Sequence, residues 1–294
     1  IIRGNEIYLC RNGLNNKNFN KENDSYYHFI LLAKDEVGAR QIMKLSTLAW
    51  KRSYIDRRMR RVPTYYQDLF DIIGSNPGHV IGSTACIGGA LGTQLLKYQK
   101  TQEPILMNKI EFWCNQLHDL FGKENFYLEM QPSHNKEQIY VNEQIIKLSD
   151  KLNIPYIITT DSHYLSKEDR PIHKAYLDAQ DGDREVDDFY ATTYMMDTDE
   201  IYEYMEQYLG EETLQKAFQN IQRISDSCEN YSLKKPLRIP ELLWRDFNDY
   251  TEDEFDFYSS KMPYLKYFKD SPYRSDRYLV KAIIDGIKSH KDLQ

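Results

Sequence analysis

The sequence contains no apolar run approaching the ~20 residues that a membrane span requires, so we expect neither a transmembrane helix nor a membrane partner. It has only four cysteines, at positions 10, 86, 114 and 228, without the paired short spacings of a disulfide framework. That usage favours a reducing compartment. A secretory signal is also absent from the N-terminus. Together these absences predict a cytoplasmic protein.

Aromatic residues, in contrast, are plentiful. The 294 residues include 24 Tyr, although hydrophobic residues make up only 41% of the chain and the mean hydropathy is −0.70. Disordered chains usually lack aromatic residues, so the composition predicts a globular protein with a polar surface. The length indicates one large domain plus an appendage. The chain starts at Ile1 without a Met and opens on a strand-like run, so we expect a cut at this end.

The charges are unevenly distributed along the chain. The formal net charge is −7, but residues 1–100 carry 15 Lys and Arg against 8 Asp and Glu. Six cations fall within eleven residues before Pro63: Lys51, Arg52, Arg57, Arg58, Arg60 and Arg61. Such a cluster can neutralise phosphates. A solvated helix end explains the cluster equally well when it is considered alone.

Short β-rich runs alternate with segments of helical period, which predicts an α/β fold. We expect strands over residues 6–10, 26–34, 79–86, 126–131 and 154–160, and a loop over 11–24. We expect helices starting at Asp35, at Pro63 and near Ala90, and helices over 105–122 and 137–152. Almost wholly apolar strands between helices indicate a parallel sheet or barrel with both faces covered.

Two potential metal ligands follow the last of these strands. Asp161 and His163 come directly after the apolar run IPYIITT. Side chains alternate along an extended backbone, so these two lie on the same side of it. In β/α folds the site usually lies at the carboxyl ends of the strands. A carboxylate and an imidazole placed there suit a divalent metal such as Zn or Mn.

Three more ligand-type residues lie on or beside predicted strands. Cys86 ends one strand before Gly88 and Gly89, His28 lies within an apolar strand, and Glu6 starts another. Each has an ordinary alternative. Cys86 could be a small apolar residue of the core, His28 a hydrogen-bonded core histidine, and Glu6 a salt-bridge partner. Taken jointly with the Asp-x-His pair, the residues favour a metal site. The remaining histidines, at positions 79, 118, 134, 173 and 290, are expected in loops or on helix surfaces.

These segments resemble a known family. RGNEIYLC, YYHFILLAKDEVGARQIMKLST, HVIGSTACIGGALG, the long block from ENFYLEMQ to TTDSHYLSKED, and HKAYLDAQ are similar to the polymerase and histidinol phosphatase (PHP) domain of bacterial DNA polymerase III alpha subunits, the C family. The blocks match in order from residue 1 to about 230.

The resemblance implies a distorted (β/α)7 barrel that binds two or three divalent metals (Zn, Mn or Mg) and can act as a phosphoesterase, removing nucleotides from 3′ ends. It also implies that Glu6, His28, Cys86, Asp161 and His163 are metal ligands and together form the catalytic cluster. The family's His-x-His strand, an Asp and a further His precede the block that contains Glu6. We therefore expect a barrel that lacks its first strands, fewer metal ions or none, and an inactive fragment.

The basic stretch also matches a family feature beside the barrel mouth, so the resemblance implies DNA phosphate contacts by Arg57, Arg58, Arg60 and Arg61. We assign residues 1–230 to the PHP domain. Residues 231–294, rich in Pro, acidic and aromatic residues, are expected to form an irregular connector, followed by a helix with Ser275 as its N-cap that starts the polymerase domain.

Two functional hypotheses remain open. The first is part of a replicative DNA polymerase, a nucleotidyltransferase that acts on DNA, whose PHP domain hydrolyses phosphodiesters. The second is a non-catalytic docking module that supports the rest of the polymerase chain and binds a separate proofreading exonuclease subunit. A free-standing PHP phosphatase is disfavoured, because such an enzyme would not need the connector and terminal helix.

Overall fold

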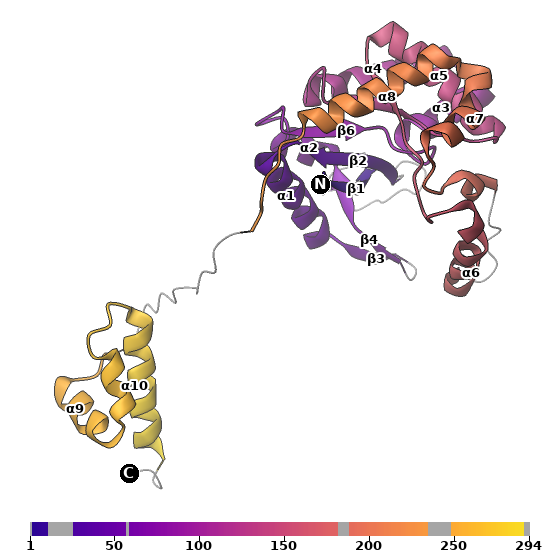
Figure 1. Ribbon diagram of the computed structural model, residues 1–294. Helices are drawn as coiled ribbons and strands as arrows, with labels where there is room; N and C mark the ends of the chain where they lie inside the picture. The colour runs from indigo at the N-terminus through magenta and orange to yellow at the C-terminus, as the bar shows by residue number, and fades with distance from the viewer. Residues whose placement is uncertain (1, 11–25, 57–58, 182–187, 235–247, 291–294) are drawn as a thin grey trace. The chain divides into compact units, whose positions relative to one another are not determined.

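A computed structural model describes residues 2–10, 26–56, 59–181, 188–234 and 248–290. The chain divides into two compact units, Ile1–Leu233 and Lys234–Gln294 (Figure 1). The loop expected over residues 11–24 lies outside the described residues. Within the described part, no helix is both long and apolar enough to cross a bilayer.

A six-stranded sheet organises the described part of the first unit. Its strand order is β5 (Pro63–Tyr65), β1 (Arg3–Cys10), β2 (Tyr27–Ala33), β6 (Val80–Ser83), β7 (Phe126–Met130) and β8 (Tyr156–Ile158). β2 runs antiparallel to both of its neighbours, whereas the other three pairings are parallel. The expected α/β class is confirmed as a mixed sheet surrounded by helices. Among the described residues, β5 and β8 are the edge strands of this sheet.

Helices follow most strands. α1 begins after the N-cap Asp35, whose carboxylate accepts a hydrogen bond from the Gly38 backbone N–H. The helices of the first unit are α1 (Glu36–Lys51), α2 (Tyr66–Ile72), α3 (Ala90–Thr101), α4 (Pro104–Phe121), α5 (Lys136–Leu152), α6 (Arg170–Asp181), α7 (Thr198–Leu209) and α8 (Glu211–Ser227), with 3-10 turns η1 (Lys167–Asp169) and η2 (Asp188–Thr192). The predicted helices near Ala90 and over 105–122 and 137–152 are confirmed.

The region after Lys51 differs from the sequence prediction. A short antiparallel ribbon, β3 (Tyr54–Asp56) and β4 (Met59–Arg61), occupies the basic stretch (Figure 1). Pro63 then begins β5 rather than the expected helix, which starts only at Tyr66. Proline is tolerated at the first residue of an edge strand, where no ladder donor is needed.

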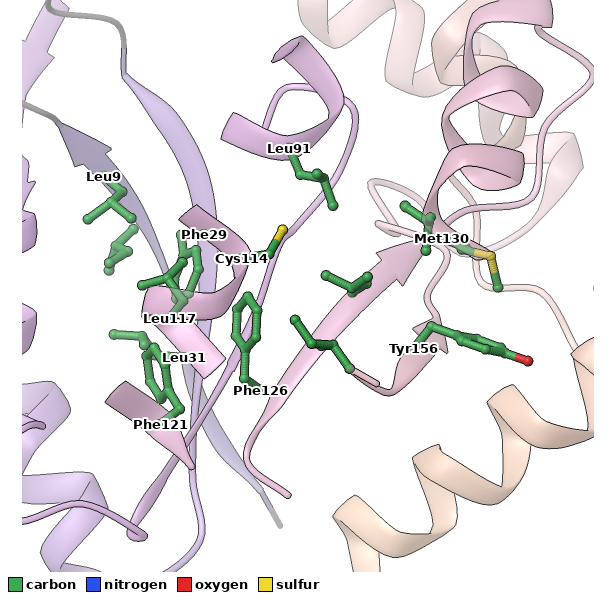
Figure 2. Packing of buried hydrophobic residues seen from close by; sticks show 14 of the residues in the cluster. Leu9, Phe29, Leu31, Leu91, Cys114, Leu117, Phe121, Phe126, Met130 and Tyr156 are labelled. Atoms are coloured by element: carbon green, nitrogen blue, oxygen red, sulfur yellow. The ribbon is translucent and has the colours of Figure 1, made fainter. Parts of the chain in front are cut away.

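The two faces of the sheet have different chemistry because side chains alternate along each strand. One face, the core face, contributes residues such as Phe29 to the main hydrophobic core. Phe29, Phe121 of α4 and Phe126 of β7 have near-parallel rings with centroids 5.8–6.4 Å apart (Figure 2). This aromatic group joins strands β2 and β7 to the helix that covers them.

The opposite face, the site face, has an apolar part and a polar part. Ile81, Tyr127 and Ile157 form a small cluster that Ile224 of α8 covers. The strand alternation places four polar residues on the same face: Glu6, His28, Ser83 and Glu129. The site face therefore carries the ligand-type residues of neighbouring strands next to one another.

The second unit is a small helical group. Its elements are α9 (Glu252–Lys261), η3 (Pro263–Phe268) and α10 (Arg274–Ser289), packed around Phe255, Leu265, Val280 and Ile284. The expectation of an irregular connector is therefore wrong for residues 252–268, because Thr251 and Glu254 form a capping box that starts a helix. The N-cap of α10 is Tyr273 and not Ser275.

Candidate functional site on the sheet

Three of the five predicted ligand residues are in direct contact. Glu6 Oε1 lies 2.8 Å from His28 Nδ1, and the Cys86 Sγ atom lies 3.4 Å from the same nitrogen. Glu6 and His28 come from adjacent antiparallel strands, where Tyr8 pairs with His28 and Glu6 pairs with Ile30. The strand register therefore places both side chains on the site face.

A tight turn brings Cys86 to this pair. After β6, Ala85 adopts a left-handed conformation with φ of 57°, which turns the chain back toward β2. Gly89 then forms a bridge with His28, and a Cβ at Gly89 would lie 2.2 Å from the Thr84 carbonyl oxygen. Only glycine fits this close approach, which explains the residue type at Gly89.

Asp161 joins the network from the end of β8. Its backbone is also left-handed, with φ of 45°, an unusual conformation that concentrates at functional sites. The Asp161 carboxyl lies near Cys86, Glu6 and His28, which all influence its pKa. His163 is held differently: its Nδ1 lies 2.6 Å from the Asp161 carbonyl oxygen, and its backbone N–H donates to Thr193. The structure thus brings Glu6, His28 and Cys86 into contact, with Asp161 and His163 beside them.

These contacts shift the ionisation of the groups. The neighbouring Cys86 and the Glu6 carboxylate raise the pKa of His28 to about 10. The hydrogen bond from His28 lowers the pKa of Glu6, against the effect of burial. Burial raises the pKa of Asp161, partly offset by His163. Glu6 and His28 therefore form an ion pair at neutral pH.

The sequence analysis missed Glu129. Its carboxylate is buried on the site face, where Ser83 Oγ and Thr159 Oγ1 each donate a hydrogen bond of 2.5 Å. Burial raises the pKa of Glu129, and the negative charges of Asp161 and Glu6 raise it further. The alternating run FYLEMQ placed a carboxylate in a buried strand, which was the available signal.

Replacing Glu129 by alanine is expected to destabilise the first unit by about 2–3 kcal/mol, because the hydroxyls of the buried Ser83 and the half-buried Thr159 lose their acceptor. Glu129→Gln keeps the shape and one acceptor oxygen, so its expected loss is below about 1.5 kcal/mol. Urea denaturation followed by circular dichroism measures both. Equal losses for the two variants would contradict this explanation, because the shared change is loss of the carboxyl group and not loss of the acceptor oxygen that glutamine keeps.

His173 was expected on a helix surface, and this prediction is wrong. The residue is only 9% exposed. Its ring centroid lies 5.6 Å from that of His163 and 5.2 Å from that of Tyr164. Helical position alone could not reveal this, because the loop after β8 folds over the start of α6 and buries it.

The basic stretch approaches the site through a row of rings. Arg61 lies over the Tyr26 ring, 5.2 Å from its centroid; Tyr26 packs edge-on against Tyr8 at 6.1 Å, and Tyr8 against His28 at 5.3 Å. Arg60 is exposed and donates a hydrogen bond to Ser53. Arg57 and Arg58 lie outside the described residues.

The donor set matches that of a divalent metal site, with carboxylates, imidazoles and a thiol. In their present arrangement, however, the side chains bond to one another. Among the described residues, no group of three or more His, Cys, Asp or Glu side chains is arranged to hold one ion. Metal binding at this place would require His28, which now contacts both Glu6 and Cys86, to change its partners.

Residues 1–133, which include Glu6, His28 and Cys86, match the PHP domain family. The chain contains a PHP domain. It is 35% identical to the probable DNA polymerase YorL of Bacillus subtilis and to the DNA-directed DNA polymerase of Bacillus phage SPbeta, in each case over 98% of this chain and 22% of the relative. It is also 28% identical to the DNA polymerase III subunit alpha of Borreliella burgdorferi, over 80% of this chain and 19% of that protein.

The predicted resemblance to DNA polymerase III alpha subunits is therefore confirmed. The chain spans about a fifth of the length of the curated relatives it matches. Asp161 and His163 lie beyond the stretch matched to the PHP domain family, but within the chain that aligns with the phage polymerase.

Proposed function

We propose that this chain is the PHP region of a replicative DNA polymerase and that its site face carries a metal-dependent phosphoesterase centre acting on DNA 3′ ends. The contacts of His28 with Glu6 and Cys86, with the Asp161 carboxyl nearby, carry this proposal. In this proposal residues 1–230 are the PHP domain, built as a distorted (β/α)7 barrel, and residues 231–294 connect it to the polymerase proper. DNA and the remainder of the polymerase are then its partners, in the cytoplasm of a bacterial cell or of a phage-infected host.

The proposed metal ligands are Glu6, His28, Cys86, Asp161 and His163. Their donor types suit Zn, Mn or Mg, with the thiol favouring Zn. A bound divalent ion lowers the pKa of a water molecule and stabilises charge on a phosphoryl oxygen. The carboxylates of Glu6 and Asp161 supply negative charge for the cation. Glu129, held by Ser83 and Thr159, adds a further buried carboxyl group beside them.

The exposed Arg60, together with Arg57, Arg58 and Arg61, is proposed to contact DNA phosphates. The row of rings from Arg61 to His28 supports this role, because it places the β3–β4 ribbon beside the site. Arginine binds phosphate through a fork of N–H donors, and such contacts position the strand without reading its sequence.

Metal binding by this chain tests the proposal. A saturating divalent metal, at about 100 times its Kd, stabilises a protein by about 2.7 kcal/mol, which corresponds to a Tm increase of about 5–10 °C. We expect this increase with at least one of Zn, Mn and Mg. His28→Ala should lose most of the increase, whereas the exposed His134→Ala should retain it. An increase of the same size in His28→Ala, or no increase with any of the three metals, would contradict the proposal.

A second candidate function is docking, favoured by an apolar groove on α2 and α4. Tyr66, Phe70, Phe112 and Trp113 line a hollow of about 260 Å³, and Phe112 is 63% exposed. Exposed apolar surface of this kind is typical of protein contacts. The groove would then receive the rest of the polymerase or a separate proofreading exonuclease subunit.

A further inference from the structure

A second hollow lies directly beside the proposed metal site. It measures about 470 Å³, within the range of small-molecule sites, and is formed by the loop after β8 and the first turns of α6. His163, a proposed metal ligand, forms one wall; the other walls are Tyr164, Leu165, Ile172, His173 and Tyr176. Asp169 also borders it. We call it the α6 hollow.

The rim of the α6 hollow is unusually apolar for a surface. Leu165 is 72% exposed, Ile172 is 69% exposed and Tyr176 is 58% exposed. These three side chains surround one hollow, whereas apolar residues scattered singly over a surface need no explanation. The α6 hollow thus presents a concave apolar surface large enough to cover a planar ring.

The floor of the α6 hollow is aromatic and contains an unsatisfied polar atom. The rings of Tyr164 and His173 are stacked, with 29° between their planes. His173 is more than nine-tenths buried, and its Nδ1 atom has no hydrogen-bond partner among the described residues. A buried ring nitrogen without a partner is costly.

The charge of the lining argues against an anionic ligand. No Lys or Arg lines the α6 hollow, and Asp169 contributes a carboxylate. A phosphate group would be repelled there and fits the arginine-rich side of the site better. A neutral, planar group matches the aromatic floor and the apolar rim.

We propose that the α6 hollow binds the base of the terminal nucleotide of single-stranded DNA, while the sugar-phosphate backbone extends past His163 toward the site face. This inference rests on the proposed function, which places the phosphodiester at the metal site next to the α6 hollow. Tyr176 and Ile172 hold the base by stacking and apolar contact, which every base allows. The α6 hollow is therefore a subsite for unpaired DNA without strong sequence preference.

Binding of a fluorescein-labelled oligo(dT) to this chain, measured by fluorescence anisotropy in EDTA and low salt, tests the inference without hydrolysis. Stacking of a base on an aromatic side chain is worth about 1–3 kcal/mol, so Tyr176→Ala should raise the Kd about 10-fold. A second oligonucleotide, identical but with an abasic 3′-terminal position, should bind the unaltered chain about 10-fold more weakly. Tyr176→Ala should have no further effect on this abasic oligonucleotide, because the same contact is already absent.

The matched control compares two exposed isoleucines. Ile172→Ala should weaken binding of the intact oligonucleotide, whereas Ile105→Ala on α4, outside the α6 hollow, should not. Independent, additive effects of Tyr176→Ala and base removal would overturn the subsite, as would unchanged affinity in Tyr176→Ala and Ile172→Ala. The result can be separated from the proposed function. If Tyr176→Ala and base removal have non-additive effects but the chain binds no metal, the subsite is supported and the metal site is not. If the chain binds metal but the two effects are additive, only the subsite is contradicted.

Discussion

Replacing Asp161 by asparagine is expected to lower metal-dependent release of 3′ nucleotides by the polymerase that carries this region by at least about 100-fold. Removing an outer-shell partner of a metal ligand already reduces affinity or activity by about 10–100-fold, so loss of a direct ligand charge should exceed that. Asparagine keeps the size of the side chain and also tolerates the left-handed backbone at this position. The fold should therefore survive the change.

The measurement is hydrolysis of a single-stranded oligonucleotide by the full polymerase, with Zn, Mn or Mg supplied in turn. Asp119→Asn, an exposed aspartate on α4, makes the same chemical change away from the site and should leave the rate unaltered. DNA synthesis by the same preparations reports whether the polymerase is intact. A nuclease rate that is equal in Asp161→Asn and Asp119→Asn would place hydrolysis elsewhere in the protein.

The second large effect is on stability. Phe126→Ala is expected to reduce the free energy of unfolding by about 3–5 kcal/mol, the usual range for truncating a buried phenylalanine. Phe126 is fully buried, and its ring packs beside those of Phe29 and Phe121 (Figure 2). Because these rings connect β2 and β7 to α4, the cavity cannot close without moving a strand or the helix.

Urea denaturation provides the measurement, with Phe112→Ala as the control. Phe112 is exposed on α4, so its truncation should change stability by no more than about 0.5 kcal/mol. The two variants remove the same atoms and differ only in burial. A loss below about 1.5 kcal/mol for Phe126→Ala would mean that the core rearranges to fill the space.

Much of the fold follows from periodicity. The strand over residues 26–34 alternates, so that Phe29 and Leu31 occupy the core face while His28 points to the site face. The predicted helices over 105–122 and 137–152 agree closely with α4 and α5, because proline or an N-cap at one end and a left-handed or glycine residue at the other define them locally. All five candidate ligands could be selected because the sequence places them on predicted strands or directly after them.

Other features depend on contacts that local sequence does not encode. The Pro63 segment has helical neighbours, yet it becomes a strand because β1 offers an unpaired edge at Tyr8. Glu129 acquires its role only when Ser83 and Thr159, far apart in sequence, meet it on the site face. His173 likewise becomes part of the α6 hollow only through the loop after β8.

The alternation of β2 also limits how this region can vary over evolutionary time. Phe29 and His28 are adjacent in sequence but belong to opposite sides of the sheet. Inserting or deleting one residue between Tyr27 and the end of β2 would exchange the side chains that face the core with those that face the site. Phenylalanine would then move into the site and histidine into the core. Substitutions can be accepted one at a time here, but changes of length cannot. Alignments of descendants should therefore show this strand without gaps even where its side chains have diverged.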